Sequence, residues 1–170
     1  EISACLVGSE MCIRDSFEEA AALTEKAIEF NGDDYNMYIP FHQAQRRLGR
    51  QRESAHIEER MIKVLRQQLE LVPEDVRARV LLAANLAYSE ADSAESVRHL
   101  QTAVALRPND PNTLYNAACT YGVLKKKTEA LETLRKAFNA GYGNRNWAAK
   151  DSDLVCLHDD PEFQKLVGQS

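Results

Sequence analysis

The stretch of residues 108–141 reads PNDPNTLYNAACTYGVLKKKTEALETLRKAFNAG and contains two helical patterns in succession. In its first half, apolar residues recur at helical spacing and place a large-small-small-large stripe on one face: Leu114, Ala117, Ala118, Tyr121 and Leu124. In its second half, Ala130, Leu134 and Ala137 form a similar stripe. Small residues let two helix axes approach closely while large ones fill the remaining gap. The spacing therefore predicts two amphipathic helices that pack as a hairpin.

The same unit occurs once more upstream. Pro73 lies 35 residues before Pro108, and the residues after it place Leu82, Ala83 and Leu86, then Ser96, Leu100 and Ala103, at the matching positions. The second triplet comes one residue late, so we expect the turn at 89–93 to be one residue longer than its counterpart. A hairpin of this kind cannot bury both faces alone, so recurrence predicts a stack of hairpins.

Helix–turn–helix units of about 34 residues ending near a proline are typical of tetratricopeptide (TPR) repeats, and on these residues the chain resembles that family. The resemblance implies an all-α fold, a right-handed α-α superhelix (TPR solenoid) closed by C-terminal capping helices. We assign residues 17–143 to a solenoid of about three and a half repeats and residues 144–170 to a capping segment.

Residues 1–16 fit this pattern poorly, because Gly8-Ser9 interrupts them and no packing stripe is present. The string LVGSEMCIRDS resembles a translated sequencing-adapter junction, so one interpretation is that this segment is foreign to the natural protein. The alternative is a frayed, degenerate first helix of a repeat. Residues 17–31 then form the second helix, and Gly32 ends it.

The next hairpin is predicted from Asp33 or Asp34 to Leu71 and deviates most from the pattern. Pro40 lies deep in its first helix, so we expect a kink or a delayed helix start there. Gln45 stands where the last repeat has Tyr121.

The segment after Gly141 loses the period and is expected to cover the open apolar face of the last repeat. Asp160-Pro161 reads as the cap and first residue of a final helix. The residues expected to be buried by capping are Trp147, Leu154, Leu157, Phe163 and Leu166. This tail resembles the closing segment of bacterial TPR regions that follow signalling domains such as protein kinases, nucleotide cyclases or winged-helix regulators.

Composition excludes several classes of protein. The chain has 26 acidic and 21 basic residues and a formal net charge of −5, which argues against a nucleic-acid binder. No apolar run approaches the roughly 18 residues of a membrane span, and the first residues lack the basic start of a signal peptide. The sequence thus predicts a cytoplasmic protein without a membrane partner.

No catalytic, cofactor or metal site is predicted. The four histidines show no i, i+4 pair, the four cysteines show no CxxC, and no phosphate loop, GxSxG or HExxH motif occurs. Cys119 and Cys156 read as small buried hydrophobes. We therefore expect no enzyme and no cofactor.

The function that the resemblance implies is protein binding, as the C-terminal interaction module of a larger bacterial signalling or regulatory protein. An alternative interpretation is a structural spacer or dimerisation arm for an upstream catalytic domain. The sequence does not identify the partner or the oligomeric state.

In TPR proteins peptides bind to the stripe of each first helix that lines the inner, concave side. The predicted binding residues are Asn36, Ile39, Gln43 and Arg47, then Arg77, Val80, Ala84 and Tyr88, then Asn112, Tyr115, Cys119 and Val123. Their aromatic, amide and guanidinium groups suit an extended or helical peptide. Chaperone-binding relatives grip a C-terminal carboxylate with a lysine, two asparagines and further basic residues. Here Ile39, Gln43 and Leu81 occupy three of those places and Asn112 and Asn116 stand at basic ones, so no chaperone-type clamp is expected.

Overall fold

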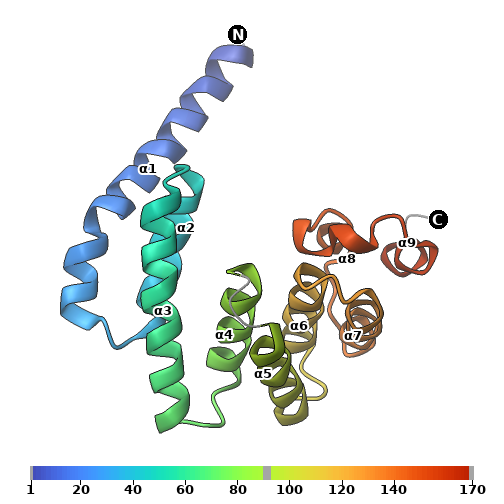
Figure 1. The fold of residues 1–170 in the computed structure, drawn as a ribbon. Coiled ribbons are helices and arrows are strands. Elements are labelled where there is room, and N and C mark those ends of the chain that lie inside the picture. The colour runs from blue at the N-terminus through green and yellow to red at the C-terminus, as the bar shows by residue number, and fades with distance from the viewer. Residues whose placement is uncertain (1, 90–92, 169–170) are drawn as a thin grey trace. The chain divides into compact units, whose positions relative to one another are not determined.

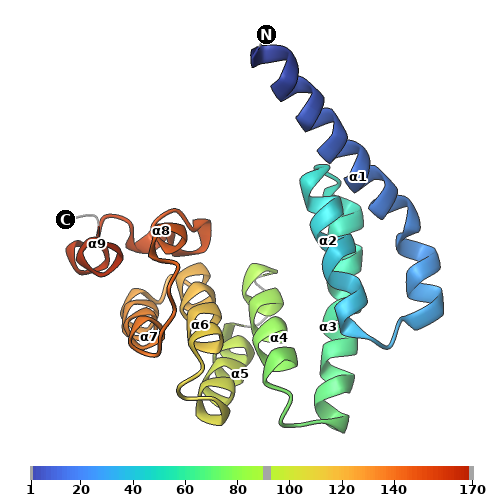
Figure 2. The same ribbon diagram turned by 180° about the vertical axis from the view of Figure 1, so that it is seen from behind.

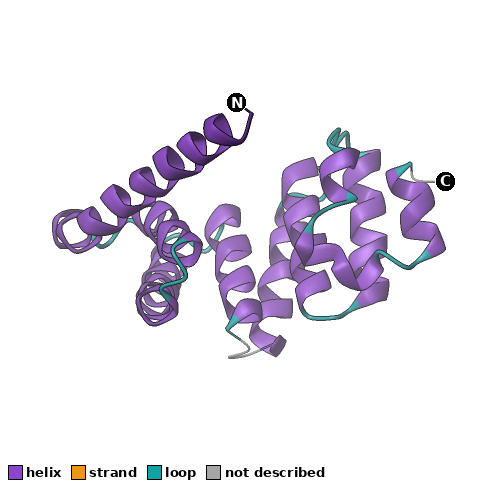
Figure 3. Ribbon diagram, turned by 90° about the horizontal axis from the view of Figure 1, so that it is seen from above, coloured by secondary structure: helices purple, strands orange, loops and turns teal. Residues whose placement is uncertain are grey.

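The computed structural model describes residues 2–89 and 93–168, and in those residues it contains helices and loops but no strand (Figures 1 and 3). The elements in chain order are α1 (Ile2–Asn31), the 3₁₀ helix η1 (Tyr35–Met37), α2 (Tyr38–Arg47), α3 (Gln51–Leu71), α4 (Val76–Tyr88), α5 (Ser93–Leu106), α6 (Pro111–Val123), α7 (Lys127–Asn139), α8 (Arg145–Ala148), the 3₁₀ helix η2 (Ser152–Leu157) and α9 (Pro161–Val167). The all-α fold class is confirmed. Within the described residues, none of the helices is both long and apolar enough to span a membrane.

The chain divides into two compact units, residues 1–67 and 68–170, with the boundary inside α3. We refer to them as unit 1 and unit 2 and describe each by itself.

Unit 1 begins with α1, which is one continuous helix from Ile2 to Asn31. The sequence predicted a separate helix that starts at residue 17, with a frayed first helix before it as one alternative. The backbone instead forms one uninterrupted helix from Ile2 onward, and the N-terminal half of α1 extends past the ends of α2 and α3 (Figures 1 and 2). The origin of residues 1–16 stays a prediction. From Ala21 on, α1 packs against the α2–α3 hairpin through buried Ala21 and Ile28, and Glu18 of α1 pairs with Arg50.

The start of α2 is delayed, as its proline predicted. Asp34 caps η1 by accepting a hydrogen bond from the backbone N–H of Asn36 at 2.9 Å. α2 begins only at Tyr38, which puts Pro40 in its first turn, where a missing N–H leaves no helical hydrogen bond unmade. The Tyr38 hydroxyl donates to the Gly32 carbonyl oxygen at 2.8 Å and so fixes the chain between α1 and α2.

Unit 2 contains two helical hairpins, α4–α5 and α6–α7. Asp75 caps α4 and Asp110 caps α6, each accepting from the N–H three residues on. The predicted stripes are buried except at Leu124, which is half-buried. The buried members are Leu82, Ala83, Leu86, Ser96, Leu100 and Ala103 in the first hairpin, and Leu114, Ala117, Ala118, Tyr121, Ala130, Leu134 and Ala137 in the second. The Ser96 hydroxyl donates to the Ala83 carbonyl oxygen at 2.7 Å, which satisfies the one polar member of the first set. The predicted longer turn at 89–93 falls largely on residues outside the described part of the chain.

The two described hairpin turns that carry a left-handed residue share one geometry. After α2, Gly49 has φ 70°, and after α6, Lys125 has φ 58°. In both turns the next N–H bonds back to the carbonyl five residues earlier, from Arg50 to Gln45 and from Lys126 to Tyr121. The left-handed position suits glycine at the first turn and strains lysine at the second.

The capping segment consists of α8, η2 and α9 and packs against α6 and α7 (Figures 1 and 2). Leu154, Leu157 and Phe163 are buried as predicted, and Leu166 is half-buried. Asp160 caps α9, with Pro161 as its first residue. The prediction for Trp147 was wrong, since its side chain is 57% exposed. The aromatic residue that packs on α6 is Tyr142, which is half-buried and whose ring stacks on Tyr115 with 3.9 Å between centroids.

Candidate protein-binding surface

The predicted binding residues of α4 follow one face of that helix from its first turn to its last residue. Arg77 and Tyr88 are exposed, Ala84 is half-buried and Val80 is buried. Tyr88 keeps 42% of its surface exposed, whereas the other apolar residues of α4 are buried or half-buried. This stripe therefore offers an aromatic group and a guanidinium at opposite ends of one helix.

The predicted binding residues of α6 have a different environment. Asn112 is exposed and Val123 is half-buried, but Tyr115 and Cys119 are buried. The Tyr115 hydroxyl donates to Asp151 Oδ2 at 2.6 Å, and the ring lies nearly parallel to that of Tyr142, with 8° between planes. The capping segment thus covers the middle of the α6 stripe.

Asp151 links the cap to α6. Its Oδ2 accepts from the Tyr115 hydroxyl, from Trp147 Nε1 at 3.1 Å and from the Cys119 thiol at 3.7 Å. Its Oδ1 accepts from the Asp153 N–H at 3.0 Å and caps η2. A carboxylate that accepts several hydrogen bonds is a strong anchor, because each bond to a charged group is stronger than a neutral one.

The raised pKa values of Cys119 and Tyr115, the two α6 residues that contact Asp151, favour a structural role for both. Burial, together with the negative charge of Asp151, raises the pKa of the Cys119 thiol, so the thiol stays protonated. Burial and the hydrogen bond to Asp151 likewise raise the pKa of Tyr115. A nucleophilic cysteine requires the opposite shift.

Cys119, Asp151 and Asp153 also form the one group in the described residues whose ligand atoms lie close enough for a metal ion, within 4.8 Å of one another. The Asp151 oxygens already accept hydrogen bonds from protein donors, and the Cys119 thiol is protonated. The closeness of these three side chains is therefore explained by the contacts that hold the cap on α6.

The predicted binding residues of unit 1 lie on η1 and α2. Asn36, Gln43 and Arg47 are exposed and Ile39 is half-buried. The Asn36 amide donates to Asp34 Oδ1 at 2.9 Å, so that side chain supports the start of the helix.

Sequence reasoning missed Tyr142 and the linking role of Asp151. Asp151 was recognisable as a helix cap, but its contact with Tyr115 joins residues 36 apart in the chain. No local pattern encodes that contact.

Comparison with known proteins places the fold. No protein-family model and no curated protein matches the sequence. The structure is similar to the crystal structure of MamA protein, with a TM-score of 0.52, 14% identity, and coverage of 95% of this chain and 82% of that one. It is also similar to the MamA RS-1 ArsTM double mutant, with a TM-score of 0.52, 18% identity, and coverage of 96% and 92%. A TPR protein with an unusual peptide-binding site, YrrB, matches at 20% identity over 83% of this chain and 84% of its own, but its TM-score of 0.41 is too low to bear on the fold. The chain has a TPR-like helical-repeat fold.

Proposed function

We propose that this chain is a protein-interaction scaffold that binds a peptide segment of a partner at the two exposed ends of the α4 stripe, Arg77 and Tyr88, and at the start of α6. The observation that carries the proposal is the pair formed by Tyr88 and Arg77 at opposite ends of one helix face. They are 11 residues apart, or about 16 Å along a helix. An extended peptide of about five residues spans that length.

The chemistry of the stripe fits such a ligand. An exposed tyrosine supplies a large contact area at a small entropy cost, and an arginine supplies several hydrogen-bond donors, so both residue types are enriched among binding hot spots. Asn112 at the start of α6 adds an exposed amide. Because the cap covers Tyr115 and Cys119, these two support the surface, and Tyr88 and Arg77 provide the direct contacts.

The partner in this proposal is an internal peptide segment. A chaperone-type clamp for a C-terminal carboxylate is not provided, because three of its positions hold Ile39, Gln43 and Leu81. Two positions that are basic in such clamps hold Asn112 and Asn116. The setting we propose is the C-terminal region of a cytoplasmic bacterial signalling or regulatory protein.

The test begins with selection of peptides from a random phage-displayed library against the full chain, followed by calorimetric titration of the selected sequence. Tyr88→Ala should weaken binding by about 1 kcal/mol or more. Lys136→Ala serves as the matched control, since Lys136 is exposed on α7 and outside the stripe. Equal affinity for the wild type and Tyr88→Ala would contradict the proposed site.

A second candidate function, a dimerisation arm, is favoured by one observation on α1. Leu23 and Phe30 are 57% and 92% exposed and lie seven residues apart on the same helix. Apolar side chains at this spacing form a stripe that a second helix covers. Sedimentation analysis should then show a dimer that Phe30→Asp dissociates, and a monomer at all concentrations would reject this function.

A further inference from the structure

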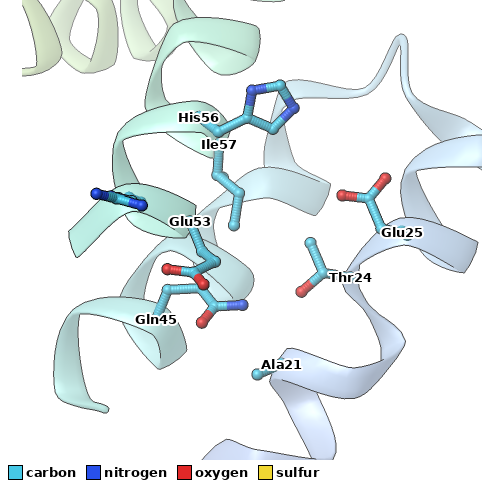
Figure 4. A pocket seen from close by; sticks show the side chains of 8 residues that line it. Ala21, Thr24, Glu25, Gln45, Glu53, His56 and Ile57 are labelled. Carbon is cyan, nitrogen blue, oxygen red and sulfur yellow. The ribbon is translucent and has the colours of Figure 1, made fainter. Parts of the chain in front are cut away.

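Unit 1 contains a cleft between α1 and the α2–α3 hairpin that the peptide-binding proposal does not use. Its volume is about 380 Å³, and it is lined by Thr24 and Glu25 from α1, Gln45 from α2, and Glu53, His56 and Ile57 from α3. Figure 4 shows these side chains gathered around one opening between the helices. All of them belong to unit 1.

The cleft coincides with a departure from the repeat pattern. Gln45 occupies the position that Tyr121 fills in the last hairpin, where the tyrosine ring is buried in the core. Glutamine is smaller than tyrosine and ends in a polar amide. The substitution therefore leaves space between the helices and places a polar group at its base.

The side-chain carbonyl oxygen of Gln45 is buried without a hydrogen-bond partner among the described residues. The residue is only 5% exposed, and its Oε1 atom accepts no hydrogen bond from any described residue. Buried polar atoms in folded proteins are nearly always paired, so each exception needs an explanation. A ligand group that donates a hydrogen bond into the cleft provides one.

The charged residues that line the cleft indicate which kind of hydrogen-bond donor it would bind. Glu53 is exposed and forms no ion pair with any residue in the described part of the chain, while Glu25 is 3.3 Å from Arg60. Arg60 therefore neutralises Glu25, and Glu53 is the carboxylate of the lining that no cation among the described residues pairs with, although the lining also holds the guanidinium of Arg52. A positively charged donor is therefore favoured over a neutral or negative one.

We propose that this cleft binds the basic side chain of a partner peptide, an ammonium or guanidinium group that donates to Gln45 Oε1 beside the Glu53 carboxylate. The aliphatic stem of such a side chain lies against the apolar wall that Ala21 and Ile57 provide. This site is made of other residues than the α4 stripe and does not depend on peptide binding there.

The test uses small probes of defined chemistry and nuclear magnetic resonance spectra of the full chain. N-acetyl-arginine amide and N-acetyl-lysine amide are titrated, and N-acetyl-citrulline amide and N-acetyl-leucine amide serve as uncharged comparators. We expect the basic probes to shift the Gln45 side-chain amide and the backbone amides of residues 53–57, with a dissociation constant on the order of 1 mM. The uncharged probes should bind at least about fivefold more weakly.

Substitutions in the cleft test whether Gln45 and Glu53 bind the basic probes. Gln45→Leu, checked for folding by circular dichroism, and the surface change Glu53→Gln should each weaken arginine-amide binding at least about fivefold. Glu59→Gln is the matched control, because Glu59 is exposed on the same helix and does not line the cleft. The proposal is overturned if no cleft amide shifts with either basic probe, if leucine amide binds as well as arginine amide, or if Glu53→Gln binds like the control.

Discussion

The substitution Gly122→Ala tests how tightly the cap is docked on α6. A Cβ atom at Gly122 would lie 2.2 Å from the Asp153 carbonyl oxygen and 3.4 Å from a Leu154 methyl group. The nearest obstacle is backbone, which cannot rotate away as a side chain can. Restoring the 3.4 Å of ordinary contact requires the start of η2 to retreat by about 1 Å.

The expected magnitude follows from two opposing effects. Overpacking of this kind costs about 1–3 kcal/mol, and the displaced η2 carries Leu154 and Leu157, both fully buried. Alanine is favoured over glycine in a helix by about 0.5–1 kcal/mol, although Gly122 is in the last turn of α6, where that gain is smaller. The net prediction is a loss of about 1–2 kcal/mol in the free energy of unfolding.

Urea denaturation followed by tryptophan fluorescence measures this effect, because the only tryptophan of the chain, Trp147, lies in the cap. Gly143→Ala is the matched control, since a Cβ there meets nothing within 4 Å and the residue has no positive φ. The control should be neutral or slightly stabilising. Unfolding of Gly122→Ala at the same or a higher urea concentration than the wild type would refute the docking of η2 on α6.

Three further predictions concern single side chains. Lys125→Gly should raise the free energy of unfolding by about 0.5–1 kcal/mol, because it relieves a left-handed lysine, and a lower melting temperature than the wild type would contradict this. Burial raises the pKa of Glu58 despite the nearby Arg46. The Glu58 carboxyl therefore binds a proton more readily in the folded state than in the unfolded state, so the folded state loses stability as pH rises above the usual carboxyl range. Glu58→Gln should therefore gain about 1 kcal/mol at pH 7 and almost nothing near pH 4, and a gain that is independent of pH in urea melts would be inconsistent with it. Asp151→Asn should lose about 1–2 kcal/mol by weakening the bonds to the cap, whereas the exposed control Asp159→Asn should melt like the wild type in the same fluorescence assay.

The repeats were predictable from sequence where packing is local and apolar. The alternation of small and large residues in 108–141 fixes both helix faces, and the structure buries those residues. The delayed start of α2 was also predictable, because Pro40 restricts the backbone wherever it occurs.

The first hairpin was harder to recognise, since polar residues stand at three positions that are apolar in the last hairpin. His42, Gln45 and Glu58 stand where the last hairpin has Ala118, Tyr121 and Leu134. His42 Nε2 lies 3.9 Å from Glu58 Oε2, and Glu58 Oε1, like Gln45 Oε1, is buried and accepts no hydrogen bond from a described residue. Sequence spacing showed the substitution at Gln45, but only the structure shows the cleft beside it.

The cap was predicted as a segment, but its contacts were not. Asp160-Pro161 marks the last helix by local chemistry, whereas the choice of Tyr142 over Trp147 as the aromatic residue packed on α6 depends on the path of the chain after Gly141. The same path brings Asp151 to Tyr115. These contacts decide which part of the predicted binding stripe is covered.

The most direct test of the proposed function is chemical-shift mapping of the full chain with a selected peptide bound. We expect the largest shifts at the exposed ends of the α4 stripe, Arg77 and Tyr88, and at Asn112, while Tyr115 and Asp151, which hold the cap on α6, keep their shifts. Shifts confined to α5 and α7, or shifts at Tyr115 and Asp151 that report displacement of the cap, would contradict it.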